Sequence, residues 1–477
     1  MTRRVVVVGH GMAGSRFVQE LRAIAPDTHI TVFGDEPGLP YNRVLLTEVL
    51  SGLCAPDDIS LGEPAEVDVR SGVKVLAVDR ARREVTAADG TLASYDALVL
   101  ATGSAPLMPR IPGLSGADGA LLPGIVPFRT LADCHQILAA ARHARRAVVL
   151  GGGLLGLEAA RGLVARGVAT EVVHAAPHLM DRQLDPAAGR VLRRTLDRLG
   201  IGCRVGAVAT GVLGIQRFRG LSFDDGSTIA ADLLVLACGV RPDVSLARAM
   251  GLTVNQGVVV DGALRSVDDP AVYAIGDCAE HDGRVYGLVG PAWEQAAVAA
   301  AAIAVTGARY TGSRLVTRLK VSNVDLAAMG DTQAGEDDDA EIVHFADPTR
   351  GTYKKLVIRD DRLVGAILLG DVATAGLVTQ LYDRGAPVPA DRLALLFAGI
   401  GPSTSDPAQL PDRATVCTCN AVTKGAIAAC VLAGARTVAD VATGTRATTG
   451  CGSCRSTVAE LVANLSTVDR APESATA

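Results

Sequence analysis

The chain has 477 residues, and its 46 Lys and Arg residues against 51 Asp and Glu residues give a formal net charge of -5. A chain of this length exceeds one hydrophobic core, so several domains are expected. Its 49% hydrophobic and 20% charged residues are typical of a soluble enzyme, and the negative net charge argues against nucleic acid as a partner.

Two arginines and four valines follow Met1 and Thr2, but Gly9 breaks this apolar run at once. The run is too short for a signal peptide or a membrane span, and no later apolar stretch reaches about 18 residues. We therefore expect no membrane partner and a cytoplasmic location, where thiols are kept reduced.

A strand, a glycine turn and a helix are predicted over residues 3–24, and a second strand over 29–36. The same order returns at 145–167 and 170–174. Uninterrupted apolar strands of this kind are typical of parallel sheets covered on both faces. Each copy is interpreted as a βαβ unit, so the chain has two nucleotide-type folds.

The first glycine turn, GHGMAG, has the spacing of a dinucleotide-binding fingerprint. Gly9 permits a tight turn, Gly11 lets a pyrophosphate approach the backbone, and Gly14 lets the helix pack on the strand. Asp35 and Glu36 follow the next strand, where a carboxylate binds ribose hydroxyls. A dinucleotide is therefore expected here.

The second turn, GGGLLG, repeats this spacing with Gly151, Gly153 and Gly156. A second dinucleotide is therefore predicted. At its ribose position the sequence has His174, and no arginine directly follows to meet a 2′-phosphate. The lack of this arginine favours NADH over NADPH, and the sequence leaves both nucleotides as candidates.

Two dinucleotides in one chain suggest a bound flavin and a diffusible nicotinamide. Several motifs then resemble the FAD-dependent pyridine-nucleotide oxidoreductases, near ferredoxin and rubredoxin reductases, over roughly residues 3 to 400. These motifs, in the order of the family, are GHGMAG, YNRVLLT, ATGS, GGGLLGLEAA, LACGVRPD, YAIGDC and WEQAAVAA.

The resemblance implies roles for residues in these motifs. Arg43 would contact the FAD pyrophosphate, and Asp277, after Gly276, the ribityl and phosphate region. Glu158 would face the nicotinamide. The remaining implied cofactor residues are Thr102 and Gly103 at a strand end, and Trp293 and Glu294 beside the isoalloxazine. Glu158 and Glu294 are expected to position the reactants.

Disulfide reductases of related fold carry a redox-active cysteine pair against the flavin. Residues 35–53 contain no cysteine, and Cys54 stands alone. We therefore expect the flavin to discharge its electrons elsewhere. The scattered cysteines are interpreted as inert core residues; they are Cys134, Cys203, Cys238, Cys278 and Cys430.

Four cysteines near the C-terminus form two pairs, Cys417 with Cys419 and Cys451 with Cys454. Four thiolates suit zinc or an iron–sulfur cluster, and a reduced cytosol disfavours disulfides. Structural zinc sites usually have two to four residues between paired ligands, so a gap of one residue favours the cluster. A small helical unit around a metal is expected.

This module resembles the bacterioferritin-associated-ferredoxin-like 2Fe-2S domain in all four ligand positions. A flavoprotein followed by such a domain resembles the N-terminal half of NADH-dependent assimilatory nitrite reductases and the electron-transfer subunit of assimilatory nitrate reductases. The resemblance implies FAD, NAD(P)H and a 2Fe-2S cluster as cofactors. With no further cysteine cluster, reduction is expected on a partner, a nitrate or nitrite reductase catalytic subunit or another electron-acceptor protein.

Three alternatives remain. The flavin could oxidise an amino acid, the chain could be a ferredoxin or rubredoxin type of reductase, or its cysteines could hold zinc in a docking protein. The intact second glycine turn argues against the first of these.

The predicted fold is α/β, with two interleaved Rossmann-like dinucleotide-binding domains, an α+β interface domain and a small helical 2Fe-2S domain. The predicted boundaries are 1–110 and 237–306 for the FAD-binding domain, 111–236 for the NAD-binding domain, 307–402 for the interface domain, 403–413 for a linker and 414–466 for the 2Fe-2S domain.

Overall fold

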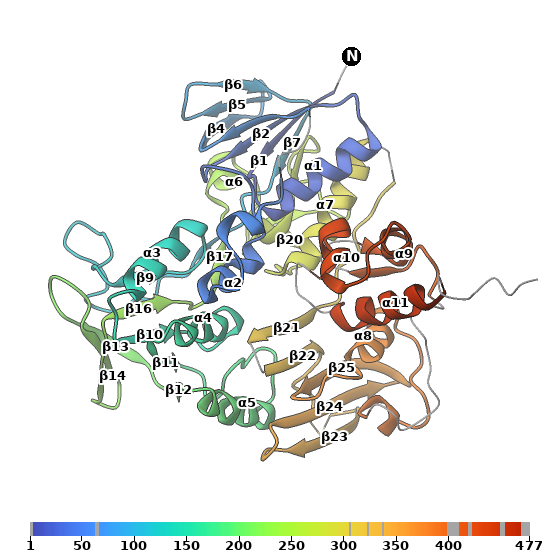
Figure 1. The fold of residues 1–477 in the computed structure, drawn as a ribbon. Coiled ribbons are helices and arrows are strands. Elements are labelled where there is room, and N and C mark those ends of the chain that lie inside the picture. The colour runs from blue at the N-terminus through green and yellow to red at the C-terminus, as the bar shows by residue number, and fades with distance from the viewer. Residues whose placement is uncertain are drawn as a thin grey trace, which may run out of the picture. The chain divides into compact units, whose positions relative to one another are not determined.

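The computed structural model of the chain forms two compact units (Figure 1). One comprises Met1–Ala175 and Gly200–Ser313, and the other Ala176–Leu199 and Arg314–Ala477. The predicted domain boundaries divide the chain more finely and stay predictions. The structure describes residues 3–62, 66–304, 307–321, 324–335, 338–397, 410–417, 422–448 and 454–468.

The first unit contains a parallel five-stranded sheet in the order β19-β7-β1-β2-β3. Val5 to Val8 of its central strand are all buried, which explains the apolar run at the start of the sequence. The strands are β1 (Arg4–Val8), β2 (His29–Gly34), β3 (Asp68–Ser71), β7 (Ala97–Leu100) and β19 (Val272–Ala274).

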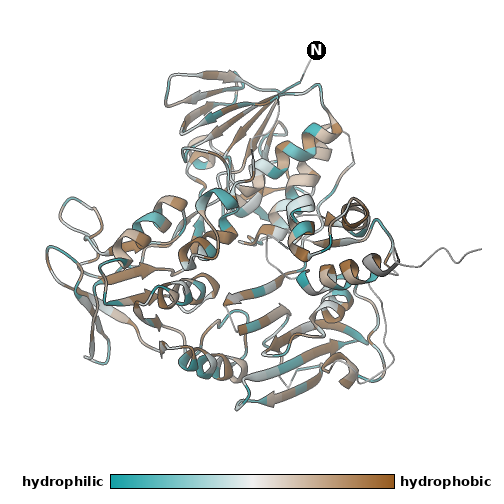
Figure 2. Ribbon diagram, in the orientation of Figure 1, coloured by the Kyte–Doolittle hydropathy of each residue, from teal (hydrophilic) through white to brown (hydrophobic). Residues whose placement is uncertain are grey.

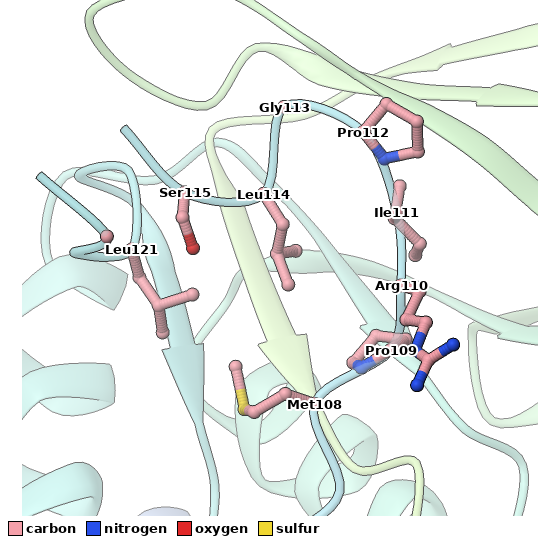
Figure 3. A pocket seen from close by; sticks show the side chains of 10 residues that line it. Met108, Pro109, Arg110, Ile111, Pro112, Gly113, Leu114, Ser115 and Leu121 are labelled. Carbon is pink, nitrogen blue, oxygen red and sulfur yellow. The ribbon is translucent and has the colours of Figure 1, made fainter. Parts of the chain in front are cut away.

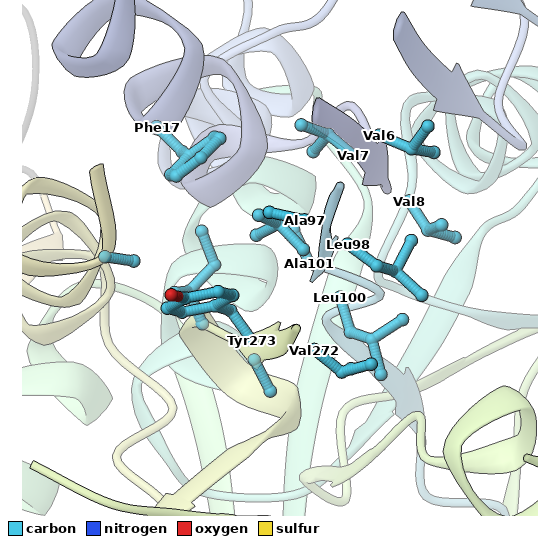
Figure 4. Close-up of a cluster of buried hydrophobic side chains, with 14 of the residues drawn as sticks. Val6, Val7, Val8, Phe17, Ala97, Leu98, Leu100, Ala101, Val272 and Tyr273 are labelled. Carbon is cyan, nitrogen blue, oxygen red and sulfur yellow. The ribbon is translucent and has the colours of Figure 1, made fainter. Parts of the chain in front are cut away.

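Helices α1 (Met12–Ile24) and α7 (Val289–Ala304) pack against each other beside this sheet. Phe17 of α1 lies in the same core cluster as the valines of β1 and as Tyr273 of β19 (Figure 4). The buried face of α7 includes Ala296, Ala299 and Ala300, and small side chains let two helices approach closely. This core holds the N-terminus of α1 and that of α7 near the ends of the strands.

A second parallel sheet has the order β12-β11-β10-β16-β9. Helix α4 (Leu154–Ala165) follows β10 and contacts it. The two sheets confirm the predicted α/β class with two βαβ units. The remaining elements are β9 (Ile125–Pro127), α3 (Leu131–Ala141), β10 (Arg146–Leu150), β11 (Ala169–His174), β12 (Ile201–Val205) and β16 (Leu233–Leu236).

Smaller sheets complete the first unit. Short helices α2 (Leu46–Ser51) and α6 (Ser245–Ala249) lie in the connections. The strands are β4 (Val75–Asp79), β5 (Glu84–Ala87) and β6 (Leu92–Ser94); β13 (Ala209–Leu213), β14 (Gly220–Phe223) and β15 (Thr228–Ala230); β8 (Ser104–Pro106) with β17 (Val240–Pro242); and β18 (Val258–Val260) with β20 (Ala279–His281).

The second unit contains an antiparallel sheet in the order β21-β22-β25-β24-β23, with α8 (Ala375–Arg384) packed on β25. Helix α5 (Pro186–Arg198) contacts β24 and β25, and brown and teal positions alternate along it (Figure 2). The strands are β21 (Val316–Val321), β22 (Val324–Gly330), β23 (Glu341–Asp347), β24 (Thr352–Arg359) and β25 (Arg362–Leu369).

A buried polar group fixes α5 to β24. Asp185, the N-cap of α5, accepts hydrogen bonds from the Tyr353 hydroxyl at 2.6 Å and from Lys355 Nζ at 3.0 Å. Burial by itself would raise the pKa of Asp185, but these bonds and that from the Ala188 N–H lower this pKa below its usual value. The carboxylate is therefore ionised and paired with the lysine.

The C-terminal residues form a short hairpin and helices. Thr423 caps α9 through the Ala426 N–H, and Thr437 and Asp440 form a capping box at α10. Ile427, Val441 and Leu461 are buried, one from each helix. The elements are β26 (Thr415–Cys417), β27 (Val422–Thr423), α9 (Lys424–Leu432), α10 (Val438–Thr445) and α11 (Arg455–Val468).

Candidate dinucleotide and electron-transfer site

The first glycine turn joins β1 to α1. A Cβ on Gly9, whose φ is +111°, would lie 2.1 Å from the Ala101 carbonyl oxygen, and a Cβ on Gly14 would lie 2.0 Å from the Gly9 oxygen. A Cβ on Gly11 would meet nothing within 4 Å. Gly9 and Gly14 are thus required by packing, whereas Gly11 leaves an open surface at the helix N-terminus, which fits a pyrophosphate.

The second glycine turn, between β10 and α4, repeats this geometry. A Cβ on Gly151 would lie 2.2 Å from the Ala237 oxygen, and one on Gly156 would lie 1.9 Å from the Gly151 oxygen. The surface at Gly153 is again open, with nothing within 4 Å of an added Cβ. Both turns therefore fit a dinucleotide in the same way.

The two carboxylates predicted for the ribose differ in their surroundings. Asp35 is exposed, with Lys74 Nζ 3.8 Å from its carboxylate. Glu36 accepts a hydrogen bond from the Tyr41 hydroxyl at 2.6 Å and pairs with the Arg43 guanidinium. Burial raises the pKa of Tyr41, so its phenol is protonated and donates to Glu36. Glu36 therefore belongs to a local network, and Asp35 faces solvent.

A second charged group lies at the strand ends around Asp277. Its Oδ2 accepts hydrogen bonds from Ser104 Oγ at 2.6 Å and from Arg129 Nη2 at 2.8 Å. Burial lowers the pKa of Arg129, while Asp277 opposes that shift and the guanidinium remains charged. Arg43 Nη1 donates to the Arg129 carbonyl oxygen at 2.7 Å. Arg129 thus connects the other two residues, because its carbonyl oxygen accepts a hydrogen bond from Arg43 and its guanidinium donates one to Asp277.

Arg129 was not identified from the sequence. Only Phe128 separates it from the end of β9, and it precedes Thr130, the N-cap of α3. Like Thr102 and Gly103, Arg129 lies just after an apolar strand, and this position is the sequence feature that points to it. Thr102 Oγ1 donates to the Asp243 carbonyl at 2.6 Å, and Gly103 has a φ of +71°.

The start of α7 lies against the first glycine turn. Trp293 Nε1 donates to the Met12 carbonyl oxygen at 3.2 Å, and the Gly276 N–H donates to Gln295 Oε1 at 2.8 Å. A Cβ on Gly276 would lie 3.0 Å from Ala13 Cβ. The structure therefore brings Gly276, Asp277 and Trp293 together around this turn. Gln295 is a buried partner that the sequence prediction did not include.

Glu294 is exposed, unlike its neighbours on α7. Its carboxylate accepts a hydrogen bond from Ser313 Oγ at 2.5 Å, and Ser313 also contacts the Tyr310 hydroxyl. Burial raises the pKa of Tyr310, so this hydroxyl is protonated. The position of Glu294 beside a flavin stays a prediction.

The predicted nicotinamide residues lie at the second turn. Thr47 Oγ1 of α2 donates to Glu158 Oε2 of α4 at 2.9 Å. His174 ends β11, and its Nδ1 accepts the N–H of Gly152 at 3.2 Å. With Nδ1 as the acceptor, the neutral ring carries its proton on Nε2. His174 is thus held against the glycine turn, and its contact with a ribose stays a prediction.

Two of the four predicted cluster ligands can be placed. Cys417 ends β26 and Cys454 precedes α11, with exposed fractions of 0% and 3%. Cys419 and Cys451 lie outside the described residues. Cys134 and Cys278 are buried in the first unit, and burial raises the pKa of both thiols, that of Cys134 to about 11.

A cavity of about 700 Å³ lies within the loop that follows β8 (Figure 3). Its walls are mostly apolar, and none of the predicted site residues lines it. The lining side chains in view are Met108, Pro109, Arg110, Ile111, Pro112, Leu114, Ser115 and Leu121. This cavity is therefore separate from the glycine turns.

Three family models match successive parts of the chain. They describe a pyridine nucleotide-disulphide oxidoreductase over residues 3–302, a rubredoxin NAD+ reductase C-terminal domain over 316–385, and a BFD-like [2Fe-2S] binding domain over 415–464. These matches confirm FAD, NAD(P)H and a 2Fe-2S cluster as the cofactors. Among the described residues, no helix combines the length and hydropathy needed to cross a bilayer.

Similar curated proteins include a nitrite reductase [NAD(P)H] of Bacillus subtilis, 37% identical over 96% of this chain and 57% of that protein. The assimilatory nitrate reductase electron transfer subunit of the same organism is 36% identical over 96% of this chain and 59% of that subunit. The nitrite reductase (NADH) large subunit of Escherichia coli is 34% identical over 94% and 54%. The chain thus spans about half to three fifths of these relatives.

Solved structures share the fold of much of the chain. The ferredoxin reductase for the CYP199A2 system of Rhodopseudomonas palustris has a TM-score of 0.73 and 26% identity, covering 81% of this chain and 96% of that one. The putidaredoxin reductase–putidaredoxin complex has a TM-score of 0.73 and 25% identity, with 81% and 94% covered. The chain therefore belongs to the pyridine nucleotide-disulphide oxidoreductase family and carries a C-terminal BFD-like [2Fe-2S] binding domain.

Proposed function

We propose that the chain oxidises NAD(P)H in the cytosol and delivers its electrons singly to the catalytic centre of a nitrate or nitrite reductase on another polypeptide. The observation that carries this proposal is the pair of equivalent glycine turns in one compact unit, followed by a [2Fe-2S] binding domain. FAD accepts a hydride and releases single electrons, and a 2Fe-2S cluster carries one electron at a time.

The chain's own residues bind and orient these groups. The open N-terminus of α1 at Gly11 would hold the FAD pyrophosphate, with Arg43 and Arg129 as neighbouring cations. Oδ2 of Asp277 accepts hydrogen bonds from Ser104 and Arg129, and Oδ1 would accept one from a cofactor hydroxyl. Glu36 would bind the ribose, held in place by Tyr41.

The nicotinamide nucleotide would lie on the N-terminus of α4 at Gly153, with Glu158 held by Thr47 beside the reacting ring. His174 would offer Nε2–H to a ribose hydroxyl, which supports NADH as the preferred donor. No general acid or base is needed for hydride transfer, so these residues act by positioning the reactants and excluding water.

The acceptor is assigned from the relatives. Proteins named as nitrite reductases and as a nitrate reductase electron transfer subunit align with nearly the whole chain. The four cysteines Cys417, Cys419, Cys451 and Cys454 would bind the cluster through which electrons leave. No cysteine pair occurs over residues 35–53, so a disulfide near the first turn is not the outlet.

The Cys454→Ser variant tests this order of transfer. NADH should still bleach the flavin absorbance at the wild-type rate, whereas electron delivery to the reductase partner should fall at least a hundredfold because a thiolate ligand is lost. The matched control is Cys430→Ser, in the same domain but outside both pairs, which should retain cluster absorbance and delivery. If the Cys454→Ser protein delivered electrons to the reductase partner at the wild-type rate, the proposal that electrons leave through the cluster would be wrong.

A further inference from the structure

Helix α4 contacts α2 along one side. Glu158, Gly162 and Arg166 are spaced by four residues, so they lie along the same side of the helix. Glu158 accepts the Thr47 hydroxyl at one end of the contact. In the middle, a Cβ on Gly162 would lie 3.0 Å from Leu50 Cγ, so glycine permits the close approach of the two helices.

Arg166 makes the contact at the other end. It is the C-cap of α4, and its Nε donates to the Leu50 carbonyl oxygen while Nη2 donates to that of Val49 at 3.3 Å. These carbonyls belong to the last turn of α2, which carries partial negative charge, and the Val49 oxygen also accepts the Gly52 N–H at 3.1 Å. Gly52 ends α2 in the left-handed conformation with a φ of +85°, and the guanidinium packs on it.

The two helices begin in the two candidate sites. Helix α2 follows Arg43 by a few residues, and α4 starts directly after Gly153. The contact between α2 and α4 therefore connects the two candidate dinucleotide sites. The contact is short, because α2 has only six residues, so each of its attachments matters.

We propose that Arg166 is a positioning residue for hydride transfer, acting through the α2–α4 contact to keep Glu158 bonded to Thr47. This inference rests on the proposed function. With both cofactors bound, the dihydronicotinamide would lose a hydride from C4 and the flavin would accept it at N5, so the nicotinamide would be oxidised as the flavin is reduced, and Glu158 would help to align the two rings. An error of about 1 Å in such an alignment costs about a hundredfold in rate.

The test is the anaerobic bleaching of the flavin by NADH in a stopped-flow instrument. Arg166→Met keeps the aliphatic stem and removes the donors. At saturating NADH its limiting rate should fall about tenfold, with the Kd for NADH changed less than twofold and the flavin spectrum unchanged. Arg166→Lys should recover part of the rate. Arg142→Met, at the exposed C-cap of α3, is the matched control and should retain the wild-type rate.

A double variant separates positioning from a general loss of stability. If Arg166 acts through Glu158, the rate of Arg166→Met with Glu158→Gln should be no lower than that of the slower single variant. If the rate of the double variant fell by the product of the two single-variant factors, the proposal would be overturned. If Arg166→Met does not fold, Gly162→Ala changes the same contact and should also slow bleaching, because its methyl group meets Leu50. An unchanged Gly162→Ala rate would then overturn the proposal.

The outcomes also distinguish this inference from the proposed function. If NADH does not bleach the flavin of the wild-type protein, the proposed function itself fails. If NADH bleaches the wild-type and Arg166→Met proteins equally fast, the proposed function stands and the positioning role of Arg166 is wrong.

Discussion

Arg129 is the residue that connects the two charged groups at the first dinucleotide site. Its backbone carbonyl accepts Arg43, and its guanidinium donates to Asp277 and Ser104. Arg43 is itself paired with Glu36, and Arg129 with Asp277. A guanidinium keeps its charge in such a pair and carries five N–H donors, so we expect both side chains to favour a bound pyrophosphate.

Replacing this guanidinium should weaken FAD binding. In Arg129→Met, the loss of a charge-assisted hydrogen bond is expected to cost about 1.5 kcal/mol or more, which is about a tenfold rise in Kd. The measurement is a titration of the apoprotein with FAD, followed by flavin fluorescence. Arg110→Met, an exposed arginine outside the network, is the control. Equal FAD affinities in both variants would contradict the role assigned to Arg129.

At the scale of elements, different glycines of each glycine turn serve packing within the chain and access for a ligand. The third glycine of each fingerprint has no room for a methyl group, whereas the second has open space. Gly153 has a φ of -83°, which alanine adopts without strain. The fold itself therefore does not require glycine at 153, and we expect its role to be to let a ligand approach the backbone.

Two alanine variants should behave in opposite ways. Gly153→Ala should leave the unfolding temperature close to that of the wild type but raise the Kd for NADH at least tenfold, because the methyl group occupies the phosphate position. Gly156→Ala should lower the free energy of unfolding by about 2 kcal/mol through overpacking. Thermal unfolding and NADH titration measure both effects. Unchanged NADH affinity in Gly153→Ala would place the phosphates elsewhere.

The elements of the site could be predicted from the sequence where the signal is local. Each glycine turn is a short segment, and the strand ends at Thr102 and Gly276 follow apolar runs. The partners of Arg129 and Arg166 could not be found in this way, because they lie far along the chain. For example, Arg129 donates to a carboxylate 148 residues away. Helical periodicity likewise marks α5 as amphipathic without identifying the sheet it contacts.

At the scale of the whole molecule, the chain combines a two-dinucleotide oxidoreductase with a domain that binds a one-electron centre. The order of the domains could be predicted from motif order and cysteine spacing. The pairing of Asp185 with Lys355, which joins α5 to the antiparallel sheet, could not, because neither residue belongs to a motif. Motifs therefore identified the cofactors, and the three-dimensional contacts identified the residues that we propose position them.

The central claim is that electrons enter as hydride and leave through the cluster. The most direct test is an anaerobic titration of the complete chain with NADH, followed by flavin absorbance and by the electron paramagnetic resonance of the reduced cluster. We expect iron in the purified protein, bleaching of the flavin, and a cluster signal that grows with added NADH. A protein that contains zinc without iron, or a cluster that stays oxidised while NADH bleaches the flavin, would contradict the claim.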